Sequence, residues 1–285
     1  MRYKITNSIK DKSRLTKDEW REYTKTVWHI ANTTDPSHPA VFPIEIPSRL
    51  IKLFSFYGET VLDPFAGVGN TAEAALSLGR ISICIDQNPR YIRIIRNRYK
   101  KIRDISRDNK ELRALTGDCR DMKIIADESI HLIVTSPPYW NKIDYGPKKE
   151  NLGNENVYVK FLENIRPAFG ECFRVLMPGR KICIVIANVN QHTNHGLLTF
   201  PLASDFCQLL RDIGFVMINE IIWSKDGTGG KWGSAKGQRP IFGSYPYPPN
   251  FLFKNVHEYI LVLAKPKRED TRGPKVINYN YLFGK

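Results

Sequence analysis

Short β-rich runs alternate with helical patterns along this chain, and this alternation limits its possible folds more than any other feature of the sequence. Such alternation is typical of βαβ units, which build a parallel sheet covered by helices. The runs that we interpret as strands are 60–63, 81–86, 112–116, 131–136, 181–187, 216–223 and 258–264. The helical patterns between them cover 46–56, 71–78, 89–103, 157–175 and 200–213.

The last two predicted strands have no helix between them, so we expect them to pair antiparallel at an edge of the sheet. The patterns predict an α/β fold: a mostly parallel, seven-stranded sheet with an antiparallel edge strand and helices on both faces. We expect one domain made of an N-terminal segment (1–58), a core (59–223), an irregular loop (224–257) and a last strand with a tail (258–285). Residues 10–30 are predicted to form one helix, with Trp20, Tyr23, Val27 and Trp28 on its apolar side.

The chain carries a strong excess of positive charge. Its 285 residues include 43 Lys and Arg against 29 Asp and Glu, a formal net charge of +14. This balance favours a polyanionic partner, with nucleic acid ahead of an anionic membrane surface. No stretch approaches the roughly 18 apolar residues of a membrane span, and the N-terminus is polar rather than a signal peptide. We therefore predict a cytoplasmic protein that does not enter a membrane.

Neither the cysteines nor the histidines indicate a disulfide framework or a metal site. The five cysteines show no Cys-x-x-Cys spacing, which is typical of reduced, buried thiols in the cytoplasm. His192 and His195 lie in a polar segment with no third ligand nearby. The sequence therefore predicts no bound metal ion.

A glycine turn follows the first predicted strand, in the run VLDPFAGVGNT. Gly67 and Gly69 allow a backbone to approach a ligand closely, and Asn70 and Glu73 have the spacing of a helix cap. A lone Gly-x-Gly is weak evidence, because tight turns between strands and helices use it without any ligand. The turn therefore needs support from other residues before it predicts a cofactor site.

That support comes from three aspartates, Asp63, Asp86 and Asp118, which end or follow three consecutive predicted strands. Parallel strands end at one edge of a doubly wound sheet, where such sheets bind ligands. Asp86, about twenty residues after the turn, is placed to accept the ribose hydroxyls of a nucleotide-like cofactor. NAD is the competing ligand, because Ala72 completes a G-x-G-x-x-A pattern. A hydride-transfer site, however, has no use for the Ser-Pro-Pro-Tyr sequence at 136–139.

The tetrapeptide Ser136-Pro137-Pro138-Tyr139 ends a buried run. Proline lacks an N–H, so the two prolines leave backbone carbonyls without amide donors beside them. The resulting rim of acceptors, with a hydroxyl and an aromatic ring, suits a flat ring that carries an amino group, such as a nucleobase. A strand-terminating turn without a ligand is the alternative interpretation.

An irregular stretch, 224–255, is unusually long for a compact domain. It contains six glycines and several aromatic residues, and aromatic residues are rare in disordered segments. We interpret it as a binding loop, with a flexible spacer as the alternative. Its basic side chains suit phosphates and its remaining side chains suit base edges, which sequence readout requires. The candidate nucleic-acid contacts in this loop are Lys225, Lys231, Trp232, Lys236, Arg239, Tyr245 and Tyr247.

A second basic segment, 90–103, holds seven Lys and Arg and no acid before Asp104. Its apolar residues fall at helical spacing and leave Arg93, Arg96, Lys100 and Arg103 on the outer side. A solvated face of a core-packed helix is the first interpretation, and nucleic-acid contact at one end of the helix is the second.

Two longer motifs and four short segments together resemble those of a known family. The two longer ones are DPFAGVG, beginning at Asp63, and TSPPYW, ending at Trp140. The short segments are HPAVFP at 38–43, RVLMPG at 174–179, WSK at 223–225 and HE at 257–258. With these motifs the chain resembles S-adenosylmethionine (SAM)-dependent DNA amino-methyltransferases of restriction-modification systems, in particular those that methylate N4 of cytosine. In many relatives with the His-Pro segment the catalytic motif comes first, so this chain looks circularly permuted.

The resemblance implies a Rossmann-like, seven-stranded methyltransferase sheet that binds SAM and acts on double-stranded DNA. It implies that the cofactor is bound by His38, Pro39, Phe42, Pro43, Asp63, Phe65, Ala66, Gly67, Gly69, Thr71, Asp86 and Asp118. Among these, Asp86 would take the ribose, Asp118 the adenine and the turn at 63–71 the methionine part. Because the target atom is inaccessible inside a duplex, the base must be flipped out.

For the chemistry we expect Ser136 and the carbonyl of Pro137 to accept the two hydrogens of the amine, in a geometry that the prolines, Pro137 and Pro138, hold rigid. Tyr139 would stack on the flipped ring, and Trp140 and Asn141 would line its pocket. The resemblance links serine at 136 to cytosine N4, with adenine N6 as the competing target.

Two further classes of protein fit the same motifs less well: a non-catalytic DNA-binding subunit with this fold, and an RNA or protein methyltransferase. The complete set of acids, glycines and the Ser-Pro-Pro-Tyr sequence argues against the first, and the long basic loop and Ser136 disfavour the second. A companion restriction endonuclease is a possible partner, and we expect a monomer or a homodimer.

Overall fold

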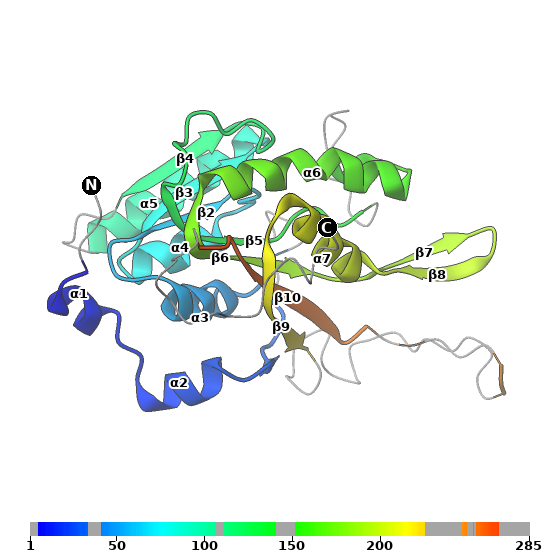
Figure 1. The fold of residues 1–285 in the computed structure, drawn as a ribbon, viewed down its shortest axis with the longest axis horizontal. Helices are drawn as coiled ribbons and strands as arrows, with labels where there is room; N and C mark the ends of the chain where they lie inside the picture. Colours follow the sequence, from blue (N-terminus) through cyan, green and yellow to red (C-terminus); the bar gives the residue numbers. More distant parts are fainter. Residues whose placement is uncertain are drawn as a thin grey trace.

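The computed structural model describes residues 5–33, 41–105, 111–140, 152–225, 247–249, 253 and 255–267, without the side chains of 101–105. Figure 1 labels the elements in these ranges. The helices are α1 Asn7–Lys12, α2 Lys17–Tyr23, α3 Glu45–Phe54, α4 Asn70–Ser77, α5 Pro89–Ile105, α6 Tyr158–Val175 and α7 Leu202–Ile213, with a 3-10 turn η1 at Leu152–Asn154. The strands are β1 Val27–His29, β2 Thr60–Asp63, β3 Ile81–Asp86, β4 Leu112–Thr116, β5 Ile130–Thr135, β6 Leu176–Ile186, β7 Val189–Thr193, β8 Gly196–Phe200, β9 Val216–Ser224 and β10 His257–Ala264.

The main sheet has eight strands in the order β1-β9-β10-β6-β5-β2-β3-β4. All seven predicted strands are confirmed, and three of them, β2, β3 and β4, match the expected bounds to the residue. β10 pairs antiparallel with β9, as expected, and also with β6. Because β9 and β1 lie beyond β10, the antiparallel strand runs inside the sheet and not along its edge.

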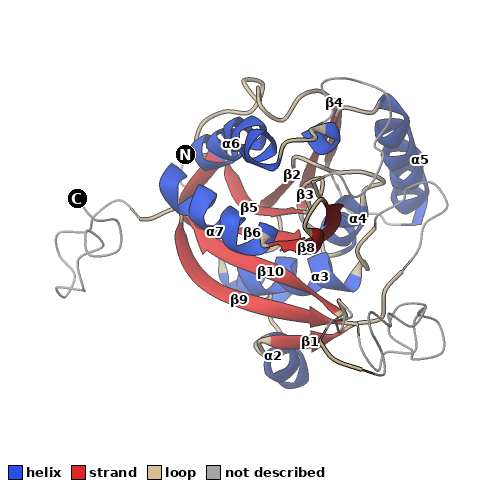
Figure 2. Cartoon of the chain, turned by 90° about the vertical axis from the view of Figure 1, so that its right-hand side faces the viewer, coloured by secondary structure: helices blue, strands red, loops and turns tan. Residues whose placement is uncertain are grey.

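Helices cover both faces of the sheet, as predicted (Figure 2). Successive side chains of a strand point to opposite faces, and β5 shows the result. Ile133 belongs to the apolar cluster under α6 and α7, whereas Leu132 and Val134 belong to the cluster under α3 and α4. Strands buried on both faces read as nearly continuous apolar runs, which is why the sequence located them well. Within the described ranges, no helix combines the length and apolar character needed to cross a membrane.

The N-terminal prediction was wrong. Residues 10–30 form no single helix; they contain the end of α1, all of α2 and the eighth strand, β1. Thr16 and Glu19 form a capping box, which starts a new helix at Lys17. β1 then pairs parallel with β9, which buries Trp28 and leaves Trp20 60% exposed. The cap and the β-branched residues that follow α2 therefore override the helical spacing.

A hairpin that the sequence did not predict, β7–β8, extends from the body of the fold (Figure 1). It carries His192 and His195 in exposed positions. No group of three His, Cys, Asp or Glu side chains suited to a metal ion occurs in the part of the chain that the structure describes. The hairpin returns to the core at Phe200, whose ring lies 4.5 Å from that of Trp140.

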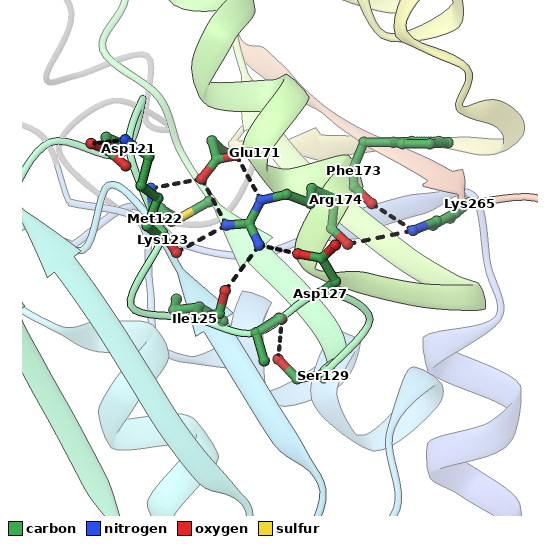
Figure 3. A network of polar contacts seen from close by, with 11 residues as sticks. Asp121, Met122, Lys123, Ile125, Asp127, Ser129, Glu171, Phe173, Arg174 and Lys265 are labelled. Atoms are coloured by element: carbon green, nitrogen blue, oxygen red, sulfur yellow. Dashed lines mark hydrogen bonds and ion pairs between the residues drawn. The ribbon is translucent and has the colours of Figure 1, made fainter.

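Arg174, in one of the segments that support the resemblance, stabilises the approach to β5 (Figure 3). It donates to the carbonyls of Met122 and Ile125 at 2.9 and 3.0 Å. It also pairs with Glu171, which accepts from the backbone N–H of Met122 at 2.7 Å. Two carbonyls and one N–H of the segment before β5 are thus tied to α6, which keeps the strand and the residues after it in place.

Candidate active site

The carboxyl ends of four parallel strands meet at one edge of the sheet, in the order β5-β2-β3-β4. Asp63 and Asp86 are the last residues of β2 and β3. Asp118 lies two residues beyond β4, and Ser136 directly follows β5. The structure therefore brings together the three predicted acids and the predicted catalytic turn, although they come from four separate parts of the sequence.

Asp63 links the glycine turn to the strand that carries Ser136. Its Oδ1 accepts a hydrogen bond from Thr135 Oγ1 at 2.6 Å and another from the N–H of Phe65 at 3.1 Å. Burial raises the pKa of Asp63 to about 6, although these hydrogen bonds favour its charged form. The hydroxyl of Thr71 also lowers the pKa of Asp63, although its Oγ1 forms no hydrogen bond with the described residues. Asp63 is 2% exposed, so it acts as a buried hydrogen-bond acceptor that joins β5 to the glycine turn.

We expect the variant Asp63→Asn to gain stability relative to the wild type as the pH rises from about 4 to 6. The folded protein holds the Asp63 proton in this range, whereas the unfolded chain, with its lower pKa, releases it. Rising pH thus lowers the contribution of Asp63 to the free energy of unfolding, by about 1.4 kcal/mol for each pKa unit of difference. Urea unfolding of both proteins across this range measures the effect, and a constant difference would contradict it.

The glycine turn is shaped by packing as well as by any ligand. Gly67 has a φ of +48° and donates its N–H to Asp86 Oδ2 at 2.8 Å. Gly69 has a φ of +91°, and a Cβ there would lie 2.6 Å from Cγ1 of Ile95 on α5. Glycine at 69 is therefore required by the backbone angle and by the approach of α5.

The predicted helix cap at Asn70 was wrong, since the N-cap of α4 is Gly69, which has no side chain to cap the helix. Asn70 instead lies in the first turn and donates to the carbonyl of Phe42 at 2.8 Å. Its Oδ1 accepts from Arg98, which also donates to the carbonyl of Val68 at 3.0 Å. The turn is thus held between the segment before α3 and the basic helix α5, a role for Arg98 that the sequence did not indicate.

The remaining predicted cofactor residues divide into those near this turn and those outside the described part of the chain. Phe42 is half-buried and Pro43 is buried, next to the turn through the Asn70 bond. Phe65 packs against Phe169 with a ring separation of 6.1 Å, and Ala66 donates its N–H to the carbonyl of Ile85. His38 and Pro39 lie outside the described residues.

Asp86 and Asp118 differ in their partners. Asp86 accepts from the N–H groups of Gly67 and Asn88, each at 2.8 Å, and burial raises its pKa. Burial also acts to raise the pKa of Asp118, but bonds from the Arg120 side chain and backbone outweigh it and lower that pKa. A carboxylate has about four lone-pair sites, so Asp86 keeps acceptor capacity for hydroxyl groups of a ligand.

The predicted catalytic turn, at 136–139, continues from β5 into the core. Ser136 is half-buried, and its Oγ lies 3.5 Å from the hydroxyl of Tyr139. Tyr139 is 8% exposed and donates to Glu258 Oε2 at 2.8 Å. Trp140 is buried between Tyr158 and Phe200, and its indole N–H has no partner among the described residues. The turn is therefore fixed on one side by an aromatic cluster and on the other by a glutamate from β10.

Comparison with known proteins identifies the family of this chain. The family model described as DNA methylase, N6_N4_Mtase, matches residues 1–97 and 130–282. The chain belongs to this DNA methylase family. It is 29% identical over 205 residues to the type II methyltransferase M.MjaI of Methanocaldococcus jannaschii, a match that covers 64% of each chain. It is 40% identical over 94 residues to the type II methyltransferase M.BglI of Bacillus subtilis, covering 32% of this chain and 27% of that one.

These matches span less than two thirds of the length of the curated relatives. A solved structure of a SAM-dependent methyltransferase from Methanosarcina mazei shares the fold, with a TM-score of 0.51 at 12% identity. That likeness covers 77% of this chain and 98% of the other. It supports the methyltransferase-like architecture of this DNA methylase family member.

Few of the predicted DNA contacts lie in the described part of this DNA methylase family member. Lys225 directly follows β9, and its ammonium group forms an ion pair with Glu258. Tyr247 is 74% exposed. Asn141, Lys231, Trp232, Lys236, Arg239 and Tyr245 lie outside the described residues. In α5, Arg96 donates to the carbonyl of Ala114 at 2.8 Å, while Arg93 and Lys100 are exposed.

Proposed function

We propose that this chain is a SAM-dependent DNA methyltransferase that transfers a methyl group to the exocyclic N4 amine of a cytosine flipped out of double-stranded DNA. One observation carries the proposal: the 2.6 Å hydrogen bond from Thr135 to Asp63 joins the catalytic turn to the glycine turn. A methyl donor held by the glycine turn and a base held by the catalytic turn would therefore be neighbours. Membership of the DNA methylase family supports DNA as the substrate.

The residues at the sheet edge fit the chemistry of SAM. SAM presents a ribose diol, an adenine amine and an ammonium group, all of which donate to carboxylates. Asp86 has acceptor capacity for the diol, Asp118 is ionised beside Arg120 and suits the adenine amine, and the turn at 63–71 would hold the methionine part. When bound, SAM would supply an electrophilic methyl group: the bond between sulfur and this carbon would break as the bond to nitrogen forms, the cofactor would leave as a neutral thioether, and the methylated nitrogen would release one proton to solvent.

The protein's own contribution is to prepare a poor nucleophile. The lone pair of the cytosine amine is delocalised into the ring, so the nitrogen must be drawn toward tetrahedral geometry. Ser136 Oγ and the Pro137 carbonyl accept its two hydrogens, and the prolines place no competing N–H nearby. Tyr139 stacks on the ring. Positioning and electrostatics then supply most of the rate gain.

Serine at 136 supports cytosine over adenine, because the chain resembles the N4-cytosine group at this motif. Methylation of adenine N6 is the second candidate, and the family model covers both. We place the protein in the cytoplasm, in a restriction-modification system with a companion endonuclease. The type II methyltransferase names of its relatives support that setting.

We expect that incubation with labelled SAM and duplex DNA, followed by digestion to nucleosides, yields label in N4-methylcytosine. Samples with RNA in place of DNA, and samples without the protein, serve as controls. Label found only in N6-methyladenine would overturn the choice of base. Absence of label in DNA from a protein that binds SAM would overturn the function itself.

A further inference from the structure

We propose that Glu258 is a positioning residue that orients the Ser136 hydroxyl through Tyr139; the inference rests on the proposed function. Ser136 Oγ lies 3.5 Å from the Tyr139 hydroxyl, which lies 2.8 Å from Glu258 Oε2. Lys225 Nζ donates to the other oxygen of the same carboxylate. The four side chains form a continuous polar chain from the catalytic turn to β9 and β10.

The carboxylate of Glu258 sets the direction of the hydrogen bonds along this chain. Glu258, paired with the Lys225 ammonium, is a carboxylate and can only accept. Tyr139 must therefore donate its proton to Glu258, which leaves the phenolic oxygen as an acceptor. The Ser136 proton then points to Tyr139, and no donor to Ser136 Oγ occurs among the described residues, so its lone pairs can accept an amine hydrogen. Hydrogen bonds in catalytic sites are often long without substrate and shorten in the complex, which accommodates the 3.5 Å separation.

The carboxylate is held on the sheet rather than on a loop. Glu258 is the second residue of β10 and lies opposite Trp223 of β9. The N–H of Lys225 donates to the Val256 carbonyl at 2.8 Å, and its ammonium lies 4.4 Å from the centre of the Trp223 ring. Trp223 in turn donates its indole N–H to the carbonyl of Ile30 at 2.8 Å. Groups supported in this way keep their geometry well enough to orient a neighbour.

This arrangement gives Lys225 a different task from the one that the sequence predicted. Its side chain is 13% exposed and that of Glu258 is 15% exposed, so the pair is largely shielded from solvent. An ammonium engaged with a carboxylate neutralises it in place, which suits the support of Glu258 better than contact with a phosphate. Lys225 is the second residue of the predicted recognition loop, so the polar chain connects the start of that loop to the catalytic turn.

The test compares single and double variants in methyl transfer to DNA under single-turnover conditions. Glu258→Gln keeps the shape but supplies an amide that can donate to Tyr139, and Tyr139→Phe keeps the ring but removes the hydroxyl. We expect each to lower the rate about tenfold, the factor associated with one charge-assisted hydrogen bond, with SAM affinity unchanged. The Tyr139→Phe/Glu258→Gln double variant should be no slower than either single variant, because both act on one chain.

The decisive comparison uses Ser136→Ala as the background. There, Glu258→Gln should cause no further loss, since no serine hydroxyl remains to be oriented. Glu220→Gln, on the exposed side of β9, is the matched control and should retain the full rate. If Glu258→Gln fails to fold, as judged by loss of SAM binding, a double-mutant cycle of Ser136→Ala and Tyr139→Phe replaces it. That cycle tests whether the Tyr139 hydroxyl acts through Ser136.

Losses that multiply in the double variants, or a wild-type rate in Glu258→Gln, would overturn the inference while leaving the proposed function intact. A wild-type protein that transfers no methyl group to DNA would overturn the proposed function, and with it this inference. The wild-type rate and the pattern among variants thus separate the two failures.

Discussion

Replacing Ser136 with alanine should lower the rate of methyl transfer to DNA by about 100-fold, a loss typical of removing one well-placed polar group from an active site. In the proposed mechanism, the hydroxyl accepts a hydrogen of the amine only while the lone pair of the nitrogen is being drawn out of the ring. Its loss therefore acts on the chemical step rather than on binding. Single-turnover transfer from labelled SAM measures the rate, and calorimetry measures SAM affinity, which we expect to stay within about twofold.

A matched control for this variant is Ser129→Ala. Ser129 lies at the opposite end of β5 and donates to the carbonyl of Ala126 at 2.6 Å, away from the sheet edge that carries Ser136. The control should transfer methyl groups at the wild-type rate. An undiminished rate in Ser136→Ala would show that another group prepares the amine, and the assigned role of Ser136 would be wrong.

Deleting residues 231–247, with the ends joined by a short Gly-Ser linker, should abolish sequence-selective methylation while SAM binding persists. The deleted stretch contains the predicted contacts Lys231, Trp232, Lys236, Arg239, Tyr245 and Tyr247. Basic residues position a protein on phosphates, and contacts to base edges supply selectivity of about 1,000-fold or more. The predicted cofactor residues all lie before position 119, so SAM affinity should not depend on this stretch.

Mapping of methylated sites in DNA from expressing cells measures the selectivity, and calorimetry measures SAM binding. Truncation of residues 269–285 removes the same number of residues from the tail and should leave the pattern of methylated sites unchanged. If selectivity survives the deletion of 231–247, the recognition element lies elsewhere in the chain.

Local sequence patterns were sufficient where a segment is buried on both faces. β2 and β3 appear at the predicted residues because their apolar runs are short, nearly continuous and bounded by turn residues. β4 also appears at the predicted residues, although it is an edge strand in which only Ala114 is buried. The same patterns place Asp63, Asp86, Asp118 and Ser136 at strand ends. Since parallel strands end at a common edge, their proximity followed without knowledge of any contact.

Patterns failed where a segment takes its structure from a distant partner. β1 was predicted as helix because the strand that it pairs with, β9, lies nearly two hundred residues away. The β7–β8 hairpin was missed because β7 is mostly polar and β8 is a short, largely exposed segment, so neither shows the apolar pattern of a buried strand. Asn70 was predicted as a cap from local spacing, whereas its actual partners are Phe42 and Arg98.

The sequence by itself determined seven of the eight strands of the main sheet and the acids at their ends, because these follow from local apolar periodicity. It also determined the resemblance to the DNA methylase family, which rests on short motifs. Only the tertiary structure decided which hydrogen-bond partner each polar group at the sheet edge has. Asp63 bonds Thr135 across 72 positions of sequence, and Tyr139 bonds Glu258 across 119. Hydrogen-bond partners of this kind depend on how strands pack in space, and no local pattern records them.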